Sequence, residues 1–89
     1  MIRRKILFYG RVQGVGFRYR AGYAAESLSL TGWVCNEEDG TVSMEVQGDE
    51  ASIDRILRIL QQDRYIDIVD MDIKNMVLQE DERSFEVRY

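Results

Sequence analysis

The sequence predicts an α+β domain in which an antiparallel sheet is covered on one face by two helices. Two observations support this fold class. Short runs in which apolar and polar residues alternate, the pattern of half-buried strands, occur near both ends and in the middle of the chain. Two segments with apolar residues every three or four positions, the pattern of amphipathic helices, separate these runs. Alternating strands and helices of this kind pack as two layers around one core.

Length and composition limit the possible organisation. A chain of 89 residues can build one modest core but not two, so residues 1–89 are expected to form a single domain. No apolar segment is long enough to cross a membrane, and none follows the N-terminus as in a signal peptide. The single cysteine, Cys35, can form no internal disulfide, which agrees with a reducing compartment. We therefore expect a cytoplasmic monomer without a membrane partner.

Composition also excludes several kinds of chemistry. With no histidine and one cysteine, the chain lacks the ligands of a structural zinc site and the partners of a Cys-His or Ser-His catalytic pair. We therefore expect no metal. The net charge of −4 argues against nonspecific nucleic-acid binding, which needs a basic face. A small anionic substrate remains compatible, because a local positive site can exist in an acidic protein.

The first strand is expected at about 3–12. Its apolar residues fall on both parities, so both faces of the strand are partly covered. The basic residues at its start, Arg3-Arg4-Lys5, are expected to be solvated.

The first helix is expected from Phe17 to about Leu30. Its apolar stripe is narrow and consists mostly of small residues, which lets the helix lie close against a sheet; it contains Phe17, Ala21, Ala24 and Leu28, with Ala25 beside it. Arg20 points elsewhere and is expected at the surface. Tyr19 and Tyr23 could line a substrate mouth, but ordinary packing is the preferred interpretation.

The second and third strands are expected at 33–37 and 41–47, joined by a hairpin loop with Asp39-Gly40 as its turn signal. Alternation places Val34 and Asn36 on one face of the second strand and the neighbouring Trp33 and Cys35 on the other. In the third strand, alternate apolar residues face the core and the polar residues between them face outward.

The second helix begins at Gly48-Asp49, with Asp49 as its N-cap, and its apolar stripe indicates a structural role. A fourth strand follows at about 68–78. Its alternation changes phase between Ile68 and Val69, which predicts a bulge. A short last strand is expected at 85–89. The order βαββαβ, with this terminal strand, is the ferredoxin-like arrangement.

The loop between the first strand and the first helix is the best candidate for a functional site. Three glycines at 10, 14 and 16 permit positive φ angles and close approach of a ligand to the backbone. No Ser, Thr, Asp or Asn lies between Gln13 and Arg18, so the first N–H groups of the helix have no capping side chain and can bind an anion. Arg18 adds a guanidinium whose geometry suits phosphate. We interpret 13–18 as a phosphate cradle; a glycine-rich turn with an arginine on its rim is the alternative.

The glycine spacing alone matches neither common nucleotide-binding motif. The complete segment around the glycines is more specific for one protein family. The segment GRVQGVGFR at 10–18, followed by GWVCN at 32–36 and DGTV at 39–42, resembles the acylphosphatase family. The resemblance extends along the chain to FEVRY at 85–89. Departures from the family pattern lie at Cys35 and in the connection 63–67, which concerns loop shape and substrate range.

This resemblance implies a function and a set of site residues. An acylphosphatase hydrolyses small acyl phosphates to a carboxylate and inorganic phosphate without a cofactor. In that family the loop backbone and its arginine bind the phosphoryl group, and an asparagine on the neighbouring strand orients the attacking water. Matched by position, the arginine is Arg18 and the asparagine is Asn36. The phosphate-binding backbone is that of Gln13, Gly14, Val15, Gly16, Phe17 and Arg18.

Other interpretations of these residues stay open from sequence alone. Arg18 could pair with Glu26 or with the terminal carboxylate, and Asn36 could serve only the turn that follows it. A noncatalytic anion-sensing or protein-interaction module could use the same fold. An RNA-recognition module is disfavoured, because it needs exposed aromatic residues on a strand and 41–47 has none.

Overall fold

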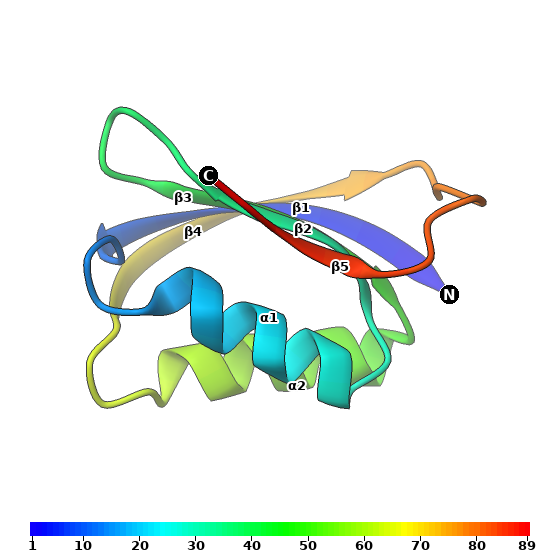
Figure 1. Cartoon of the computed structure of the whole chain (residues 1–89), viewed down its shortest axis with the longest axis horizontal. Coiled ribbons are helices and arrows are strands. Elements are labelled where there is room, and N and C mark those ends of the chain that lie inside the picture. Colours follow the sequence, from blue (N-terminus) through cyan, green and yellow to red (C-terminus); the bar gives the residue numbers. More distant parts are fainter.

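Two helices cover one face of a five-stranded sheet in the computed structural model, which describes residues 1–89 (Figure 1). The elements in chain order are β1 (Ile2–Arg11), α1 (Phe17–Ser27), β2 (Thr31–Asn36), β3 (Val42–Gly48), α2 (Glu50–Gln61), β4 (Asp67–Met76) and β5 (Phe85–Arg88). The strand order across the sheet is β4-β1-β3-β2-β5. The predicted ferredoxin-like fold is therefore confirmed. Neither helix has the length and hydropathy needed to cross a membrane.

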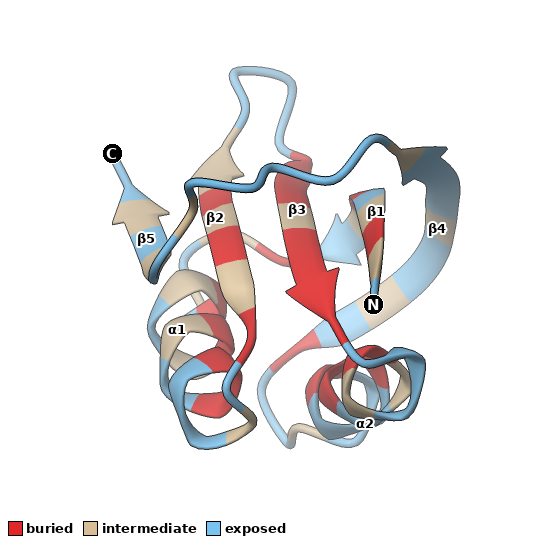
Figure 2. Ribbon diagram, turned by 90° about the vertical axis from the view of Figure 1, so that its right-hand side faces the viewer, coloured by how far each residue is buried: buried red, intermediate tan, exposed pale blue.

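The two edges of the sheet differ in how their outer strand pairs with its neighbour. The expected antiparallel arrangement holds for β4-β1-β3-β2, whereas β5 lies parallel to β2, so the sheet is mixed. Residues 77–84 cross from β4 at one edge to β5 at the other (Figure 2). This crossing brings the end of the chain beside the start of α1.

The bulge predicted in the fourth strand is present. The pairing of β1 with β4 shifts register between Tyr9 and Gly10, opposite Ile68 and Asp70, so that Val69 is the extra residue. Gly10 has a φ of 125°, and a Cβ atom there would lie 2.2 Å from the carbonyl oxygen of Asp67. Only glycine fits at this close approach, which turns the chain toward the loop before α1.

α1 ends at Ser27, before the predicted boundary at Leu30. Ser29 adopts a φ of 57°, and the N–H of Leu30 donates to the carbonyl of Ala25 at 2.8 Å, which is a Schellman ending without glycine. The sequence has no glycine or proline here to signal the ending, so the apolar period alone extended the predicted helix too far.

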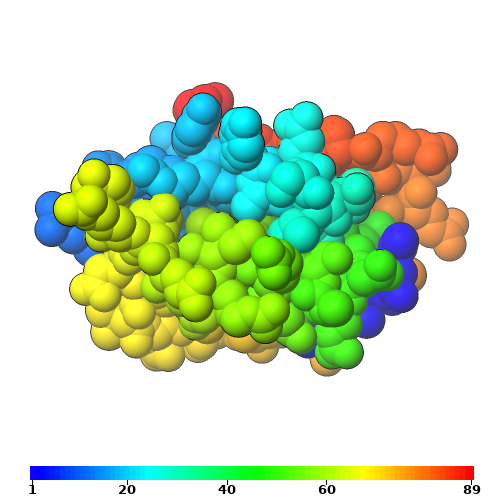
Figure 3. All heavy atoms as spheres, turned by 90° about the horizontal axis from the view of Figure 1, so that it is seen from below, coloured from blue at the N-terminus to red at the C-terminus, as the bar shows by residue number.

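The core lies between the sheet and the two helices, which pack side by side (Figure 3). The predicted stripe of α1 is buried at Phe17, Ala21, Ala24 and Ala25, while Leu28 is only partly buried. The ring of Phe17 packs against that of Phe8, with 4.8 Å between centroids. This contact anchors the first residue of α1 to β1, on both sides of the glycine-rich loop.

The face of the sheet that the helices do not cover is less exposed to solvent than expected. Arg3, expected to be solvated, is 3% exposed; its guanidinium donates to Glu45 at 2.9 Å and to Glu82 at 2.8 Å. Gln47, expected to face outward, is also buried and exchanges hydrogen bonds with the backbone of Gln79. Gln47 does lie on the outward face, as predicted, but the segment 77–84 folds back over this face, so neither Arg3 nor Gln47 is solvated.

The pair of Arg3 and Glu82 makes stability depend on pH. Burial would raise the pKa of Glu82, but the hydrogen bond from Arg3 lowers that pKa below its usual value. A carboxylate whose pKa is lower in the folded state stabilises the fold above its unfolded pKa of about 4.3. That stabilisation is lost as the pH falls through the folded-state pKa.

We therefore expect Glu82→Gln to lower the free energy of unfolding by about 2 kcal/mol at neutral pH. The gap between the variant and the wild type should shrink in acid, because protonation removes the same charge. Urea unfolding at neutral pH and at about pH 3 measures both effects. The matched control is Glu80→Gln, since Glu80 is exposed and forms no ion pair. An equal effect of the two substitutions would show that the pair of Arg3 and Glu82 does not stabilise the fold.

Candidate active site

The loop from Val12 to Gly16 carries unpaired backbone donors. Gly14 and Gly16 have φ angles of 73° and 79°, in the left-handed region that favours glycine. Gly16 is the N-cap of α1, and no side chain caps the helix, as the sequence predicted. None of the backbone N–H groups from Gln13 to Tyr19 has an acceptor within the chain. These donors lie where the helix dipole also favours a negative charge.

Arg18 lies in the first turn of α1 and is held by the last strand. Its Nη1 donates to the carbonyl of Arg88 at 2.9 Å, and its guanidinium carbon lies 4.7 Å from the centre of the Tyr89 ring. It forms no ion pair, either with Glu26 or with the terminal carboxylate, so that alternative is wrong. A neutral carbonyl and a ring orient the guanidinium without cancelling its charge.

Asn36 ends β2 at the same end of the sheet. It pairs with Val42 of β3, and Val42 in turn pairs with Phe8 of β1, just before the glycine-rich loop. Asn36 shares its face with the buried Val34, as alternation predicted, and is itself half-buried. Cys35 points to the other face of the sheet, away from the loop.

The hairpin after Asn36 is held by its own hydrogen bonds. The N–H of Glu37 donates to the carbonyl of Thr41 at 2.9 Å. The carboxylate of Asp39 accepts hydrogen bonds from the hydroxyl and the N–H of Thr41 at 2.6 and 3.0 Å. The hydroxyl bond in particular lowers the pKa of Asp39. The predicted turn thus has a defined shape, and it fixes the position of the strand end that carries Asn36.

The side chain of Gln13 joins the loop to this hairpin. Its Nε2 donates to the carbonyls of Glu37 and Thr41, at 2.7 and 2.8 Å. The sequence predicted a role only for the backbone of Gln13. It carried no signal for the side-chain contact, because an amide can donate to any carbonyl and its acceptors lie on a distant hairpin. The contact holds the glycine-rich loop against the strand that carries Asn36.

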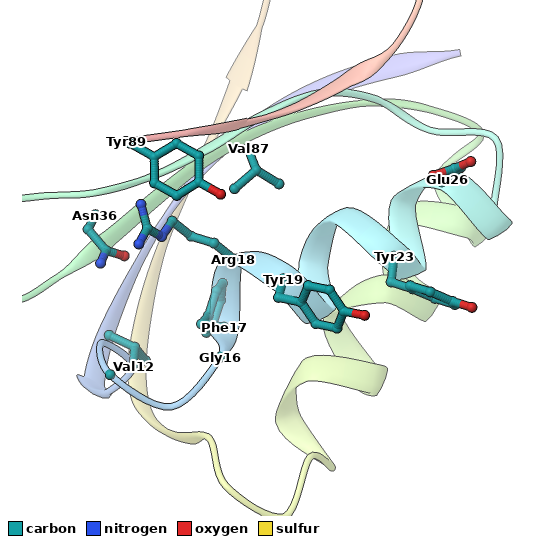
Figure 4. Close-up of a pocket in the computed structure, with 11 residues that line it drawn as sticks. Val12, Gly16, Phe17, Arg18, Tyr19, Tyr23, Glu26, Asn36, Val87 and Tyr89 are labelled. Carbon is teal, nitrogen blue, oxygen red and sulfur yellow. The ribbon is translucent and has the colours of Figure 1, made fainter.

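A pocket of about 390 Å³ brings these parts together (Figure 4). At one end it is lined by Gly14, Gly16, Phe17, Arg18 and Asn36, and it extends along α1 past Tyr19, Tyr23 and Glu26, with Val87 and Tyr89 opposite. Gln13 and Val15 belong to the same loop but do not line the pocket. No cluster of three His, Cys, Asp or Glu side chains suited to a metal ion is found in the structure.

The expected packing of Tyr19 and Tyr23 was wrong. Their side chains are 72% and 71% exposed, with 6.2 Å between the ring centroids, and both line the pocket. The narrow stripe of α1 is already filled by its alanines, which leaves the tyrosines on the solvent side of the helix. They form an apolar wall next to Arg18.

The family model for acylphosphatase matches residues 4–87. The chain belongs to the acylphosphatase family. The acylphosphatase of Clostridium perfringens strain SM101 is 44% identical over 86 residues, which are 96% of this chain and 97% of the relative. The acylphosphatase of Geobacillus kaustophilus is 40% identical over 90 residues, covering 100% of this chain and 96% of the relative.

A solved acylphosphatase has the same fold. The crystal structure of the acylphosphatase from Bacillus subtilis superposes with a TM-score of 0.91 at 30% identity, covering 100% of both chains. Similarity over nearly the full length of the relatives shows that this chain is an acylphosphatase enzyme. No finding favours the noncatalytic alternative.

Proposed function

We propose that this acylphosphatase binds the phosphoryl group of a small acyl phosphate between the backbone of Gln13 to Arg18 and the guanidinium of Arg18, while Asn36 orients the attacking water. The observation that carries the proposal is the uncompensated charge of Arg18. The Arg18 side chain lines the same pocket as Gly14, Gly16 and Asn36. It lies beside N–H groups that have no acceptor in the chain.

The donors match the charge of the reacting group. Phosphoryl transfer spreads negative charge over three equatorial oxygens and depends on positioning and electrostatic stabilisation. Preorganised N–H groups at a helix N-terminus and a guanidinium fork supply both. Because they are held by the fold before substrate arrives, they need little reorganisation during the reaction.

The leaving group explains why the site needs no strong acid. An acyl phosphate releases a carboxylate, whose conjugate acid has a pKa of about 4, so the leaving oxygen needs no proton. The water oxygen forms the new bond to phosphorus, and the bond from phosphorus to the acyl oxygen breaks with its electron pair. The amide oxygen of Asn36 accepts a hydrogen bond from the water and aligns it, but an amide is too weak a base to take its proton. We place that proton on a phosphoryl oxygen of the substrate.

The loss of benzoyl phosphate, followed by ultraviolet absorbance with EDTA present, tests this mechanism. The wild type should hydrolyse the substrate without a metal ion, at a rate that changes little with pH near neutrality. Hydrolysis that requires added Mg²⁺ would contradict it. Phosphate binding without hydrolysis would favour an anion-sensing module.

The proposal includes a cytoplasmic monomer with no nucleic-acid or membrane partner. The net charge of −4 disfavours a polyanionic partner. Analytical ultracentrifugation tests the monomeric state.

The acyl group is proposed to lie along the wall formed by Tyr19 and Tyr23. Aromatic contacts contribute about 0.5–1.5 kcal/mol beyond area burial, so Tyr23→Ala should raise KM for benzoyl phosphate about 3-fold to 10-fold. Acetyl phosphate has no ring to pack against a tyrosine and serves as the control substrate. Equal changes of KM for the two substrates would place the acyl group elsewhere.

A further inference from the structure

Arg20 lies at the surface, as the sequence predicted, with its side chain 35% exposed, but its guanidinium makes contacts that the sequence did not predict. Its Nη1 donates to the carbonyl oxygen of Val15 at 2.8 Å, and its Nε pairs with Oδ2 of Asp63 at 2.7 Å. Its guanidinium carbon lies 5.4 Å from the centre of the Tyr65 ring. One side chain thus connects the glycine-rich loop to the segment after α2. Figure 3 shows that segment, in yellow, beside the blue and cyan residues of the loop and α1.

The partners of Arg20 are themselves held in place. Asp63 accepts the N–H of Tyr65 through Oδ1 at 2.8 Å, and its side chain is only 16% exposed. The connection 63–67 therefore supplies both the carboxylate and the ring that orient the guanidinium.

Gly16 has a second reason to be glycine besides its backbone angle. A Cβ atom at this position would lie 2.3 Å from Nη1 of Arg20, so the guanidinium occupies the space where a side chain would begin. With a side chain at residue 16, the end of the Arg20 side chain would have to move away from its present position.

The contact with Val15 fixes the direction of a neighbouring N–H group. The carbonyl of Val15 and the N–H of Gly16 belong to one planar peptide group, which is trans, so they point in opposite directions. Arg20 holds the carbonyl on its own side. The N–H of Gly16 is thereby directed away from Arg20; it has no acceptor in the chain, and Gly16 lines the pocket.

The loop needs such a restraint. Gly14 and Gly16 flank Val15, and glycine has access to more backbone conformations than any other residue, so the peptide between Val15 and Gly16 can rotate unless something holds it. Asp63 neutralises Arg20, which therefore acts as a clamp rather than as a second binding site for phosphate.

We propose that Arg20 is a positioning residue which, anchored by Asp63, locks the Val15–Gly16 peptide so that the Gly16 N–H faces the phosphoryl group of the substrate. This inference rests on the proposed function of the loop. It identifies a residue that acts on the reaction without touching the substrate.

The test compares Arg20→Met and Asp63→Asn with the matched control Arg64→Met. Arg64 also lies over the ring of Tyr65, at 5.8 Å, and its removal changes the net charge equally, but it has no hydrogen bond to the loop. Three quantities are measured: the Kd of inorganic phosphate by calorimetry, kcat and KM for benzoyl phosphate, and the NMR shift of the Gly16 amide on adding phosphate.

We expect Arg20→Met to raise the Kd of phosphate about 10-fold and to lower kcat/KM about 10-fold to 100-fold, because one oriented donor is lost. Asp63→Asn should have a smaller effect of about 3-fold in the same direction, since it weakens only the anchor. Arg64→Met should change neither quantity. The Gly16 amide should shift on adding phosphate in the wild type and lose this response in Arg20→Met.

Unchanged phosphate affinity and an unchanged Gly16 response in folded Arg20→Met would overturn the proposal. So would equal losses in Arg20→Met and Arg64→Met, since these would reflect charge alone. If Arg20→Met does not fold, Asp63→Asn decides, and wild-type affinity in that variant overturns the proposal. If the wild type binds phosphate but hydrolyses no acyl phosphate, the proposed function fails, while the Gly16 response still decides the role of Arg20.

Discussion

Replacing Asn36 with alanine is expected to lower kcat for benzoyl phosphate by about 10²-fold to 10³-fold and to leave the affinity for inorganic phosphate unchanged. The amide is assigned to the water and not to the phosphoryl group, so its loss removes alignment of the nucleophile only. Misplaced reacting groups and lost polar contacts in a transition state have effects of this size.

Steady-state kinetics and phosphate calorimetry on the same preparation measure the two quantities. Cys35→Ala is the matched control, because it changes the neighbouring residue of β2 on the opposite face of the sheet. A full rate in Asn36→Ala would remove Asn36 from the reaction. A parallel loss of phosphate affinity would assign it to phosphate binding instead.

Replacing Arg18 with alanine is expected to damage both binding and turnover. The guanidinium meets the phosphoryl charge in the bound substrate and more strongly in the transition state, where an arginine can contribute about 10³-fold or more to the rate. We therefore expect Arg18→Ala to raise the Kd of phosphate and to lower kcat/KM by about 10³-fold. Arg18→Lys should recover only part of the loss, since an ammonium keeps the charge without the planar fork.

Arg11→Ala is the control for charge. Arg11 is exposed at the end of β1, forms no ion pair and does not line the pocket, so its removal changes net charge near the loop without touching the site. Equal effects of the two substitutions would mean that Arg18 acts through the general field of the protein. In that case the hydrogen bond to Arg88 and the contact with Tyr89 would be structural only.

The local parts of the fold were predictable because they depend on neighbouring residues. Alternation identified the strands and placed Asn36 on the same face as Val34, and a change of phase located the bulge at Val69. The lack of a capping residue before Phe17 correctly predicted a helix start with unpaired N–H groups. The end of α1 was misplaced because a serine, rather than a glycine, adopts the left-handed conformation there.

The contacts that were missed involve long polar side chains with partners remote in sequence. Arg3 was expected in solvent, yet it binds Glu82, which is 79 residues away. Arg20 lies at the surface, as expected, but its contacts with Val15 and Asp63 were not predicted. Periodicity states which side of an element a residue occupies, but it contains no information on whether another segment will cover that side.

By itself, the sequence determined the order of the elements, the donor-rich loop, and the candidates Arg18 and Asn36. Only the tertiary structure decided that these residues line one pocket, that the charge of Arg18 has no carboxylate partner, and that Gln13 and Arg20 hold the loop from two sides. The physical reason is the range of the interactions. Backbone conformation and capping are set within a few residues, whereas a flexible amide or guanidinium takes whichever acceptor the folded chain places within about 3 Å.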